Sequence, residues 1–293
     1  MTLSNITLSK KTLTAAALAC SACLLGSASA ETITVCPDGS CDFTDPAEAA
    51  SVAAPGDVIE IAAGIYPLEE TVSFFGSEIT VRGAVDAYGQ PATILDGQGS
   101  ILVLGVGYAD QAVIENLVIT NGYGDYGGGA RFIASDDIVV RNCHFRDNHA
   151  NWDGGGLRTS LDATLTLVDC EITGNTADHP TWPGQSRGAG ANIVGAGLTL
   201  VRTRVCGNVE SSDPGRQITG VDESDLVGSG SCIQRDCEGC VTTDRADLNF
   251  DGIVDGADMT VLLGSWGVSG PGDLDGNGVV DGADLSRLLG SWG

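Results

Sequence analysis

Two acidic segments near the C-terminus carry the clearest chemical signal in this sequence. DLNFDGIVDGAD and DLDGNGVVDGAD begin at Asp247 and Asp273, 26 residues apart, and each precedes a short helical stretch that ends in LLGSWG. Oxygen ligands at loop positions 1, 3, 5, 9 and 12, with glycine at position 6 for a sharp turn, form the pattern that a hard cation of calcium's size requires. The sequence therefore predicts two Ca2+ ions, one in each loop.

The spacing also assigns the ligands, with a backbone carbonyl at position 7 of each loop. In the first loop they are Asp247, Asn249, Asp251, Ile253, Asp255 and Asp258. In the second loop they are Asp273, Asp275, Asn277, Val279, Asp281 and Asp284. The acids at position 9, Asp255 and Asp281, bind directly or through water. A disordered acidic tail is the competing interpretation, which the joint recurrence of acids, glycine and helix disfavours.

A second group of polar residues lies in the middle of the chain. Its members are Asp136, Asp137, Arg141, His144, Arg146, Asp147, Asp153, Arg158 and Glu171. A carboxylate pair there could protonate a glycosidic oxygen, and an arginine with bound calcium could take a proton alpha to a uronate. Trp152 and Trp182 could stack on sugar rings. The alternative is that the outward positions of a solenoid are polar in any case and that loop aromatics only anchor their loops.

The cysteines indicate an oxidising compartment. Of the ten cysteines, Cys20 and Cys23 fall in the N-terminal apolar segment, which leaves an even number for disulfides. Cys36 and Cys41 bracket a Pro-Asp-Gly-Ser turn and are expected to be bridged. The group Cys206, Cys232, Cys237 and Cys240 fits two disulfides, or one disulfide and two thiols, better than a zinc site.

The elements that must position these residues follow a loose repeat. An apolar-x-apolar-x-turn pattern occurs five times, and its turn residues are Gly83, Asn116, Asn142, Asp169 and Arg202. After four of them an inward pair follows, beginning at Leu117, Cys143, Cys170 and Thr203. Small-residue segments recur at 127–130, 154–157 and 188–191. Period-2 strands that recur at intervals of roughly 20 to 35 residues predict an all-β coiled solenoid.

Stacking of the coils has specific consequences. Each coil adds one strand to a parallel stack at about 4.8 Å spacing. Cys143 should then lie over Cys170, as a bridge or as two free thiols, and His144 should lie close to Glu171 on the outer face. A helix over 46–54, capped by Thr44 or Asp45, is expected to cover the first coil ahead of a buried strand.

The N-terminus predicts export from the cell, and the net charge limits the possible partners. Lys10 and Lys11, an apolar run over 13–25 and the small residues 28–30 predict a signal peptide cleaved before Glu31. A lipoprotein anchored at Cys20 is disfavoured because its apolar run is short. After residue 11 there is no lysine, and the net charge is −25, which excludes nucleic-acid binding. No other segment is long and apolar enough to span a membrane.

The coil pattern resembles the right-handed parallel β-helix of the pectate-lyase-like superfamily. GDVIEIAAGIY, EITVRG and ATILDG are similar to its first coils, and the GGG and HFRDN segments are similar to its variable repeats. The resemblance implies a polysaccharide-directed outer face. The missing lysines exclude lysine-base lyases, and the Asn-Thr-Asp and Gly-His-Gly elements of polygalacturonases are absent. An arginine base remains, with Arg141, Arg146 and Arg158 as candidates.

The duplicated loop-helix with aspartate at position 12 is similar to the type I dockerin, a calcium-folded module that attaches secreted carbohydrate-active proteins to a cohesin. The resemblance implies a cohesin-like or cell-surface protein as partner. Loop positions 10 and 11, which commonly contact the cohesin, are small here: Gly256, Ala257, Gly282 and Ala283. That departure leaves an anchoring or sorting role open.

Together these patterns predict a secreted or cell-surface protein in four parts. They are a signal peptide (1–30), a right-handed parallel β-helix (31–232), a cysteine-containing linker (233–243) and a small α-helical dockerin-like module (244–293). The coil is expected to bind or cleave extracellular polysaccharide, as a lyase or glycoside hydrolase if it is an enzyme. The alternative is a non-catalytic surface, adhesion or structural protein that uses the coil as a spacer or protein-binding face.

Overall fold

The computed structural model describes residues 30–76, 78–182, 184–195, 197–213, 216–221, 226, 230–238, 244–249, 253–268, 270, 272–275 and 277–293. The predicted signal peptide, apart from Ala30, lies outside these residues, as do Cys20, Cys23, Cys240 and the loop residue Asp251. Within the described ranges, no helix has the length and apolar character needed to cross a membrane.

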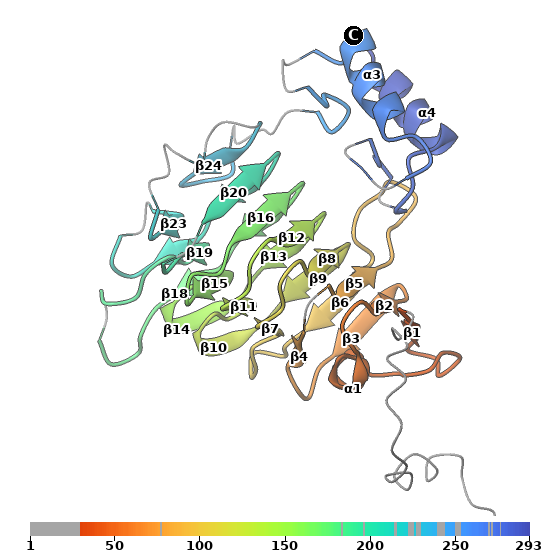
Figure 1. The fold of residues 1–293 in the computed structure, drawn as a ribbon. Coiled ribbons are helices and arrows are strands. Elements are labelled where there is room, and N and C mark those ends of the chain that lie inside the picture. The colour runs from red at the N-terminus through yellow and green to blue at the C-terminus, as the bar shows by residue number, and fades with distance from the viewer. Residues whose placement is uncertain are drawn as a thin grey trace, which may run out of the picture.

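The chain winds into a parallel β-helix in which the strands of successive coils stack to form four sheets (Figure 1). Sheet A contains β1 (Thr32–Val35), β2 (Val58–Ile61), β5 (Thr80–Gly83), β8 (Val113–Glu115), β12 (Ile138–Arg141), β16 (Leu165–Val168) and β20 (Leu198–Val201). Sheet B contains β3 (Gly64–Pro67), β6 (Thr93–Asp96), β9 (Leu117–Thr120), β13 (His144–Arg146), β17 (Glu171–Thr173), β21 (Arg204–Cys206) and β24 (Cys232–Gln234). The last strand carries the coil two residues past the expected boundary at 232.

Two further sheets complete the coil. Sheet C contains β4 (Val72–Phe75), β7 (Leu104–Gly107), β11 (Ala130–Ile133), β15 (Leu157–Ser160), β19 (Ala191–Asn192) and β23 (Ile218–Thr219). Sheet D contains β10 (Tyr123–Tyr126), β14 (His149–Asp153), β18 (Thr176–Ala177) and β22 (Val209–Glu210). The coiled solenoid predicted from the repeat and the right-handed parallel β-helix implied by the resemblance are confirmed, whereas sheet D, which begins only at β10, was not predicted.

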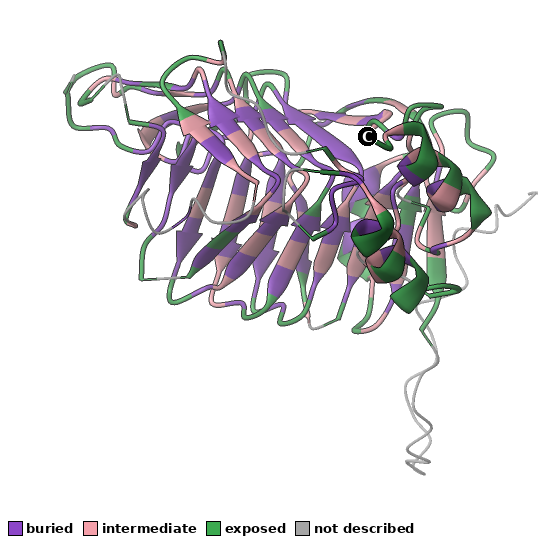
Figure 2. Cartoon of the chain, turned by 90° about the horizontal axis from the view of Figure 1, so that it is seen from above, coloured by how far each residue is buried: buried purple, intermediate pink, exposed green. Residues whose placement is uncertain are grey.

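The predicted inward ladders form the core. Ile138, Leu165 and Leu198 are register partners in sheet A, and Phe145 pairs with Ile172 in sheet B. All five are buried, while alternate residues of the same strands face outward (Figure 2). This alternation follows from the period of two in a β-strand.

Helix α1 (Pro46–Val52) covers the first coil, as expected. Its N-cap is Asp45, whose carboxylate accepts a hydrogen bond from the Ala47 amide, so of the two cap candidates Asp45 is confirmed and Thr44 is wrong. Ala49 and Ala50 are buried against the coil. The helix therefore closes an apolar stack end that would otherwise be open to other chains.

The backbone conformation of the turns between sheets A and B explains which residue types end each repeat. Asn116, Asn142, Asp169 and Arg202 all adopt positive φ, between 45° and 61°. Asn and Asp are the non-glycine residues that tolerate this region best. Gly83 occupies the equivalent place in an earlier coil, where a side chain would collide with the Asn116 carbonyl. The turn residues thus set the corner of each coil.

A buried amide ladder joins sheets B and D and was not recognised in the sequence. Asn148 donates to Asn175 at 2.9 Å, Asn175 donates to Asn208 at 2.8 Å, and Asn208 donates to Gln217 at 2.9 Å. All four side chains are at most 1% exposed. Because each amide both donates and accepts, the ladder satisfies polar groups that burial would otherwise leave without partners.

The cysteines are placed largely as predicted. Cys36–Cys41 is a disulfide, and Cys206–Cys237 is a second one, which overturns the zinc alternative for that group because bridged sulfurs cannot be thiolate ligands. Cys232 is also disulfide-bonded. Cys143 and Cys170 lie in adjacent coils as expected, and both are buried free thiols.

We expect Cys143 and Cys170 to react with alkylating reagents only after unfolding. Burial raises the pKa of Cys170 to about 12 and that of Cys143 well above its usual value, so neither thiol forms the reactive thiolate at neutral pH. Mass spectrometry of peptides alkylated with and without urea would measure this, with Cys36 and Cys41 as unlabelled internal controls. A peptide that links Cys143 to Cys170 would contradict it.

The C-terminal part forms a separate small core beside the coil. Helices α3 (Gly256–Gly264) and α4 (Gly282–Gly290) pack on each other around buried residues Ala246, Leu248, Val254, Leu262, Leu274, Val280 and Leu288. Figure 1 places this tail next to the loop that follows β5. A core of this size is too small to stabilise a module well on its own.

Candidate functional site

The second acidic loop has the geometry of a cation site. Asp273, Asp275 and Asp284 each offer a carboxylate oxygen, and these oxygens lie within 4.8 Å of one another. Gly278 has φ +90°, as the sharp turn at position 6 requires. The Asp273 carboxylate accepts hydrogen bonds from the amides of Asn277 and Gly278, at 3.1 and 2.8 Å, which curls the loop around it.

The aspartate at position 12 is held in the same way in both loops. Asp284 is fully buried and accepts hydrogen bonds from the amides of Leu274, Asp275 and Asp281. In the first loop Asp258 accepts from the corresponding amides, those of Leu248, Asn249 and Asp255. A carboxylate has about four lone-pair sites, so three amides leave room for a cation. The repeated geometry supports equivalent roles for the two acids.

Charge in the loops also fits a cation. Burial raises the pKa of Asp275, and the neighbouring carboxylates of Asp284 and Asp273 raise it further. For Asp258 burial acts upward as well, but the three amides outweigh it and hold its pKa below the usual value. A bound divalent ion would neutralise this concentration of carboxylates. The residues at positions 1, 3, 7, 9 and 12 of both loops are described, and Asp251 at position 5 of the first loop is not.

The acids at position 9 have a further role. Asp255 and Asp281 are the N-caps of α3 and α4, and each accepts a hydrogen bond from the amide two residues ahead, at 2.7 Å. Each pairs with the position-12 acid in a capping box. The loop and the following helix are therefore one unit, so order in the loop is coupled to order in the helix.

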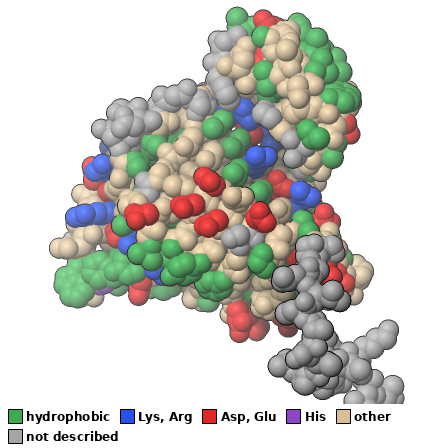
Figure 3. All heavy atoms as spheres, in the orientation of Figure 1, with side chains coloured by type: hydrophobic (Ala, Val, Ile, Leu, Met, Phe, Trp, Pro, Cys, Tyr) green, Lys and Arg blue, Asp and Glu red, His purple; other side chains and the backbone are tan. Residues whose placement is uncertain are grey.

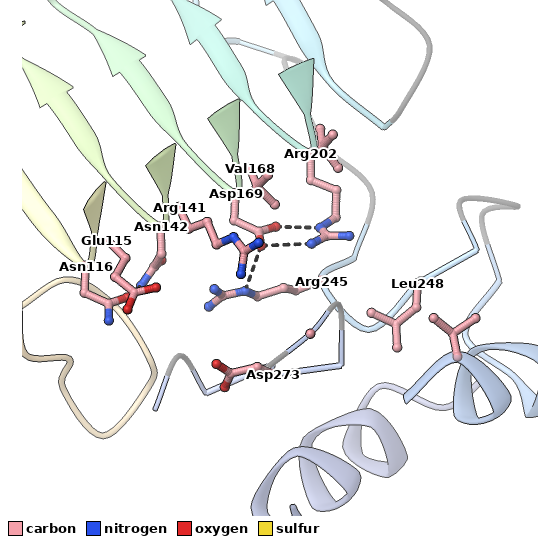
Figure 4. A pocket seen from close by; sticks show the side chains of 13 residues that line it. Glu115, Asn116, Arg141, Asn142, Val168, Asp169, Arg202, Arg245, Leu248 and Asp273 are labelled. Carbon is pink, nitrogen blue, oxygen red and sulfur yellow. Dashed lines mark hydrogen bonds and ion pairs between the residues drawn. The ribbon is translucent and has the colours of Figure 1, made fainter. Parts of the chain in front are cut away.

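The tail packs on the coil around a cavity of about 300 Å3 (Figure 4). Arg202 makes two hydrogen bonds to the Asp169 carboxylate, and Arg245 from the tail lies 3.4 Å from the same group. Arg287 on α4 donates a hydrogen bond of 3.5 Å to the carbonyl of Ala87, which lies in the loop that follows β5. These contacts attach the tail to the turns between sheets A and B, which we call the turn column and which comprise Asn116, Asn142, Asp169 and Arg202.

The polar cluster proposed from the sequence does not form one site. Arg141 ends β12 and lines the cavity beside the tail, whereas His144, Arg146 and Glu171 lie on sheet B. Asp153 and Arg158 lie on sheets D and C. The prediction of one cluster is wrong because β12, β13, β14 and β15, which follow one another along the chain, belong to four different sheets. Nearness in the chain therefore does not mean a shared face.

Within that set, the predicted neighbours His144 and Glu171 are register partners in sheet B. Glu171 forms an ion pair of 3.1 Å with Arg204 on the next strand. Burial lowers the pKa of His144; Glu171 opposes this, and Arg146 and Arg204 reinforce it. His144 is thus a neutral imidazole beside a carboxylate that is already paired, and the described residues of this column offer no free carboxylate pair for acid–base chemistry.

We expect His144 to make the coil less stable in mild acid. The unfolded histidine titrates near pH 6.5, above the lowered pKa of the folded one, so the unfolded chain takes up the proton first. The contribution of His144 to the free energy of unfolding is therefore present above about pH 6.5 and is lost as the pH falls through the pKa of the folded state. When the free energy of unfolding is measured in urea at pH 7.5 and at pH 5.5, it should fall less between the two pH values for His144→Gln than for the wild type. His179→Gln is the control, and a His144→Gln variant that tracks the wild type would contradict the assignment.

The strongest candidate for ligand recognition is the outer surface where sheets C and D meet. Arg131 and Arg158 are register partners on β11 and β15, and each guanidinium carries a buried Nε with no hydrogen-bond partner among the described residues. The Arg158 guanidinium lies 4.5 Å from the centre of the Tyr126 ring. Tyr126 in turn is the register partner of Asp153. Arg158 and Arg187 both act electrostatically on the Asp153 carboxylate.

Electrostatics at this surface reflect the shared carboxylate. Burial lowers the pKa of Arg158; Asp153 opposes the shift, and the positive charge of Arg131 adds to it. Burial raises the pKa of Asp153, and Arg158 and Arg187 act against that rise. The half-buried cations Arg131 and Arg158 are register partners, and among the described residues neither forms an ion pair with a carboxylate. An anionic group of a ligand would supply the missing partner.

An aromatic cluster adjoins these arginines. The Trp152 ring stacks on Trp182 at 5.5 Å, and His179 contacts both, at 4.0 and 4.9 Å between ring centres. Tyr123 stacks on His149 at 5.5 Å. Trp182 is 55% exposed and Tyr126 is 40% exposed. Figure 3 shows hydrophobic side chains gathered at the lower left of the molecule, in the region where Figure 1 places β14 and β18.

We call this surface the arginine–aromatic face; it comprises Tyr123, Tyr126, Arg131, Trp152, Asp153, Arg158, His179, Trp182 and Arg187. Four of these residues, Asp153, Arg158, Trp152 and Trp182, are candidates from the sequence. Arg131 and Tyr126 are not recognised from the sequence. The available signal was the recurrence of G-G-G-apolar-Arg at 127–131 and 154–158, which places both arginines at one position of consecutive coils.

Comparisons with known proteins identify no family. No protein-family model matches the chain, and no curated protein matches its sequence. Similar solved structures include a pectin methylesterase mutant bound to a hexasaccharide, at 12% identity and a TM-score of 0.42, and a pectate lyase, at 18% identity and 0.43. These alignments cover 64% and 70% of this chain and 58% of each of those chains. The pectin methylesterase from Aspergillus niger is 15% identical, with a TM-score of 0.36 and coverage of 68% and 71%.

Proposed function

We propose that the coil binds an acidic polysaccharide outside the cell, across the arginine–aromatic face, and that the tail folds around two calcium ions and attaches the protein to a surface or complex. The observation that carries the proposal is the pair of stacked, half-buried arginines, Arg131 and Arg158, beside exposed aromatic rings. Uronate carboxylates or sulfates match the guanidinium fork, and sugar rings stack on aromatic faces.

Specificity for an acidic polymer follows from the charge balance. The chain carries a net charge of −25, so an anionic polymer is repelled everywhere except where arginines gather. On this face Arg158 and Arg187 act on the Asp153 carboxylate, and Arg131 lies beside Arg158. Polymer binding should therefore be local, oriented and sensitive to salt.

The tail supports an attachment role. Its two copies expose the same apolar residues: Leu263 and Leu289 at 48% and 52%, and Trp266 and Trp292 at 47% and 46%. Exposed leucine and tryptophan at equivalent positions of a small module are typical of a protein-contacting surface. Gly256 and Ala257, like Gly282 and Ala283, are exposed at the helix starts and offer no hydroxyl to a partner. We therefore favour a partner that contacts the tail through apolar residues.

The test is affinity electrophoresis of the calcium-loaded protein in gels containing polygalacturonate, alginate, a sulfated polysaccharide or neutral galactan. Retardation by an acidic polymer, weakened by salt and absent with galactan, would support the proposal. No retardation by any acidic polymer would reject it in favour of the spacer or adhesion role. Parallel assays of unsaturated products at 235 nm and of reducing ends would show whether binding leads to cleavage.

A further inference from the structure

The start of the folded chain lies against a buried carboxylate. The Glu31 backbone nitrogen donates a hydrogen bond of 2.8 Å to Asp57 Oδ1, and the Ala54 nitrogen donates one of 2.8 Å to Asp57 Oδ2. Asp57 is 7% exposed, and its own backbone carbonyl accepts from Thr80 on β5. The side chain therefore joins the first residue of the coil to the turn that follows the capping helix α1.

Asp57 has no ionic partner among the described residues. No described arginine or histidine forms an ion pair with it, and its carboxylate is satisfied by the two backbone amides alone. A buried carboxylate is more stable beside a positive charge than beside neutral donors only. The predicted mature chain begins at Glu31, and the nitrogen that meets Asp57 is then the free α-amine.

We propose that signal-peptide removal at the Ala30–Glu31 bond creates an ion pair between the new Glu31 α-ammonium and Asp57, which locks the capping end of the coil. Signal peptidase hydrolyses the peptide bond with one water, so Ala30 leaves with the carboxylate and the Glu31 amine takes up a proton. The same nitrogen keeps its place and changes from a neutral to a charged donor. Processing therefore changes the stability of the fold as well as the location of the protein.

Two independent observations coincide at this bond. The small residues 28–30 predict cleavage after Ala30, and the first backbone nitrogen fixed by the coil is that of Glu31. Ala30 is exposed, and the Glu31 carbonyl accepts a hydrogen bond from Val58 at 2.9 Å. A chain that began one residue earlier or later would place its amine away from the Asp57 carboxylate, since successive Cα atoms are about 3.8 Å apart.

The absence of lysine from the predicted mature chain allows its α-amine to be labelled selectively. After Lys11 the chain has no lysine, so the α-amine is the only primary amine of a mature protein that starts at Glu31. Cyanate, or formaldehyde with a reducing agent, then labels this one amine. The mass of the intact protein, followed over time, gives the labelling rate. Ion pairing keeps the amine protonated, and only the neutral amine reacts.

We would compare three folded, calcium-loaded proteins: the mature chain, a chain that retains Ala30, and the mature chain with Asp57→Asn. The exported protein should begin at Glu31 by N-terminal sequencing. Its amine should react with cyanate at least tenfold more slowly than the amine of the Ala30 chain, which corresponds to about 1.4 kcal/mol. Asp57→Asn has nearly the same shape without the charge and should restore fast labelling.

Three results would overturn the proposal: a different mature N-terminus, equal labelling rates in the mature and Ala30 chains, or slow labelling that persists in Asp57→Asn, which would mean steric shielding alone. If Asp57→Asn does not fold, the melting temperatures of the mature and Ala30 chains before and after carbamylation serve as the test instead. Carbamylation should then lower the melting temperature of the mature chain and leave that of the Ala30 chain unchanged. Equal shifts would reject the ion pair.

Discussion

Replacing Arg131 and Arg158 with glutamine is expected to reduce affinity for an acidic polysaccharide more than 100-fold. Each guanidinium would contribute a charge-assisted contact of about 1.5–3 kcal/mol to a bound carboxylate or sulfate. Because the two side chains are register partners, one repeating unit of the polymer can contact both. Affinity electrophoresis and isothermal titration with the polymer that binds best would measure the loss.

Arg146→Gln is the matched control, because it removes an exposed arginine from sheet B without changing the arginine–aromatic face. The control should bind as the wild type does, and each single variant should lose about 10-fold or more. Circular dichroism would confirm that the variants keep the coil. If the double variant binds as tightly as Arg146→Gln, the polymer lies elsewhere and the assignment of this face is wrong.

Removal of calcium is expected to unfold the tail while the coil stays folded. The tail's buried cluster contains only seven described residues, whereas the coil has a continuous core along its whole length. At about 100 times the dissociation constant, one bound ion adds roughly 2.7 kcal/mol to the stability of the folded state. Chelation should therefore remove the helical signal of α3 and α4 and expose Trp266 and Trp292 further, which fluorescence can follow.

The two loops can be separated by substitution at position 12. Asp284→Ala should bind one calcium ion instead of two, with at least a 100-fold loss of affinity at the second loop, and Asp258→Ala should do the same at the first. Glu70→Gln, an exposed acid on the coil, should leave both ions in place. Calcium titration by calorimetry gives the stoichiometry. Two ions bound by Asp284→Ala would contradict the ligand assignment.

The two kinds of site differed in how far the sequence could predict them. Each acidic loop is contiguous, so a candidate ligand set such as Asp273, Asp275 and Asp284 follows from spacing alone, and the structure places these three carboxylates close together. The arginine–aromatic face is assembled from separate coils. Tyr126, Asp153 and Arg158 become neighbours only through the register of β10 with β14 and of β11 with β15.

Sequence by itself determined the solenoid, the turn column, the cap helix and the positions of the acids in the two loops, because each rests on a local rule: strand alternation, the tolerance of Asn and Asp for positive φ, a helix cap or a fixed spacing along the chain. Tertiary structure alone decided that Arg141 faces the tail, that His144 and Glu171 belong to a different surface from Arg158, and that Asn175 joins a buried amide ladder. The reason is physical: insertions of variable length separate the strands, so the face that each outward side chain joins is fixed by coil register, a long-range packing outcome.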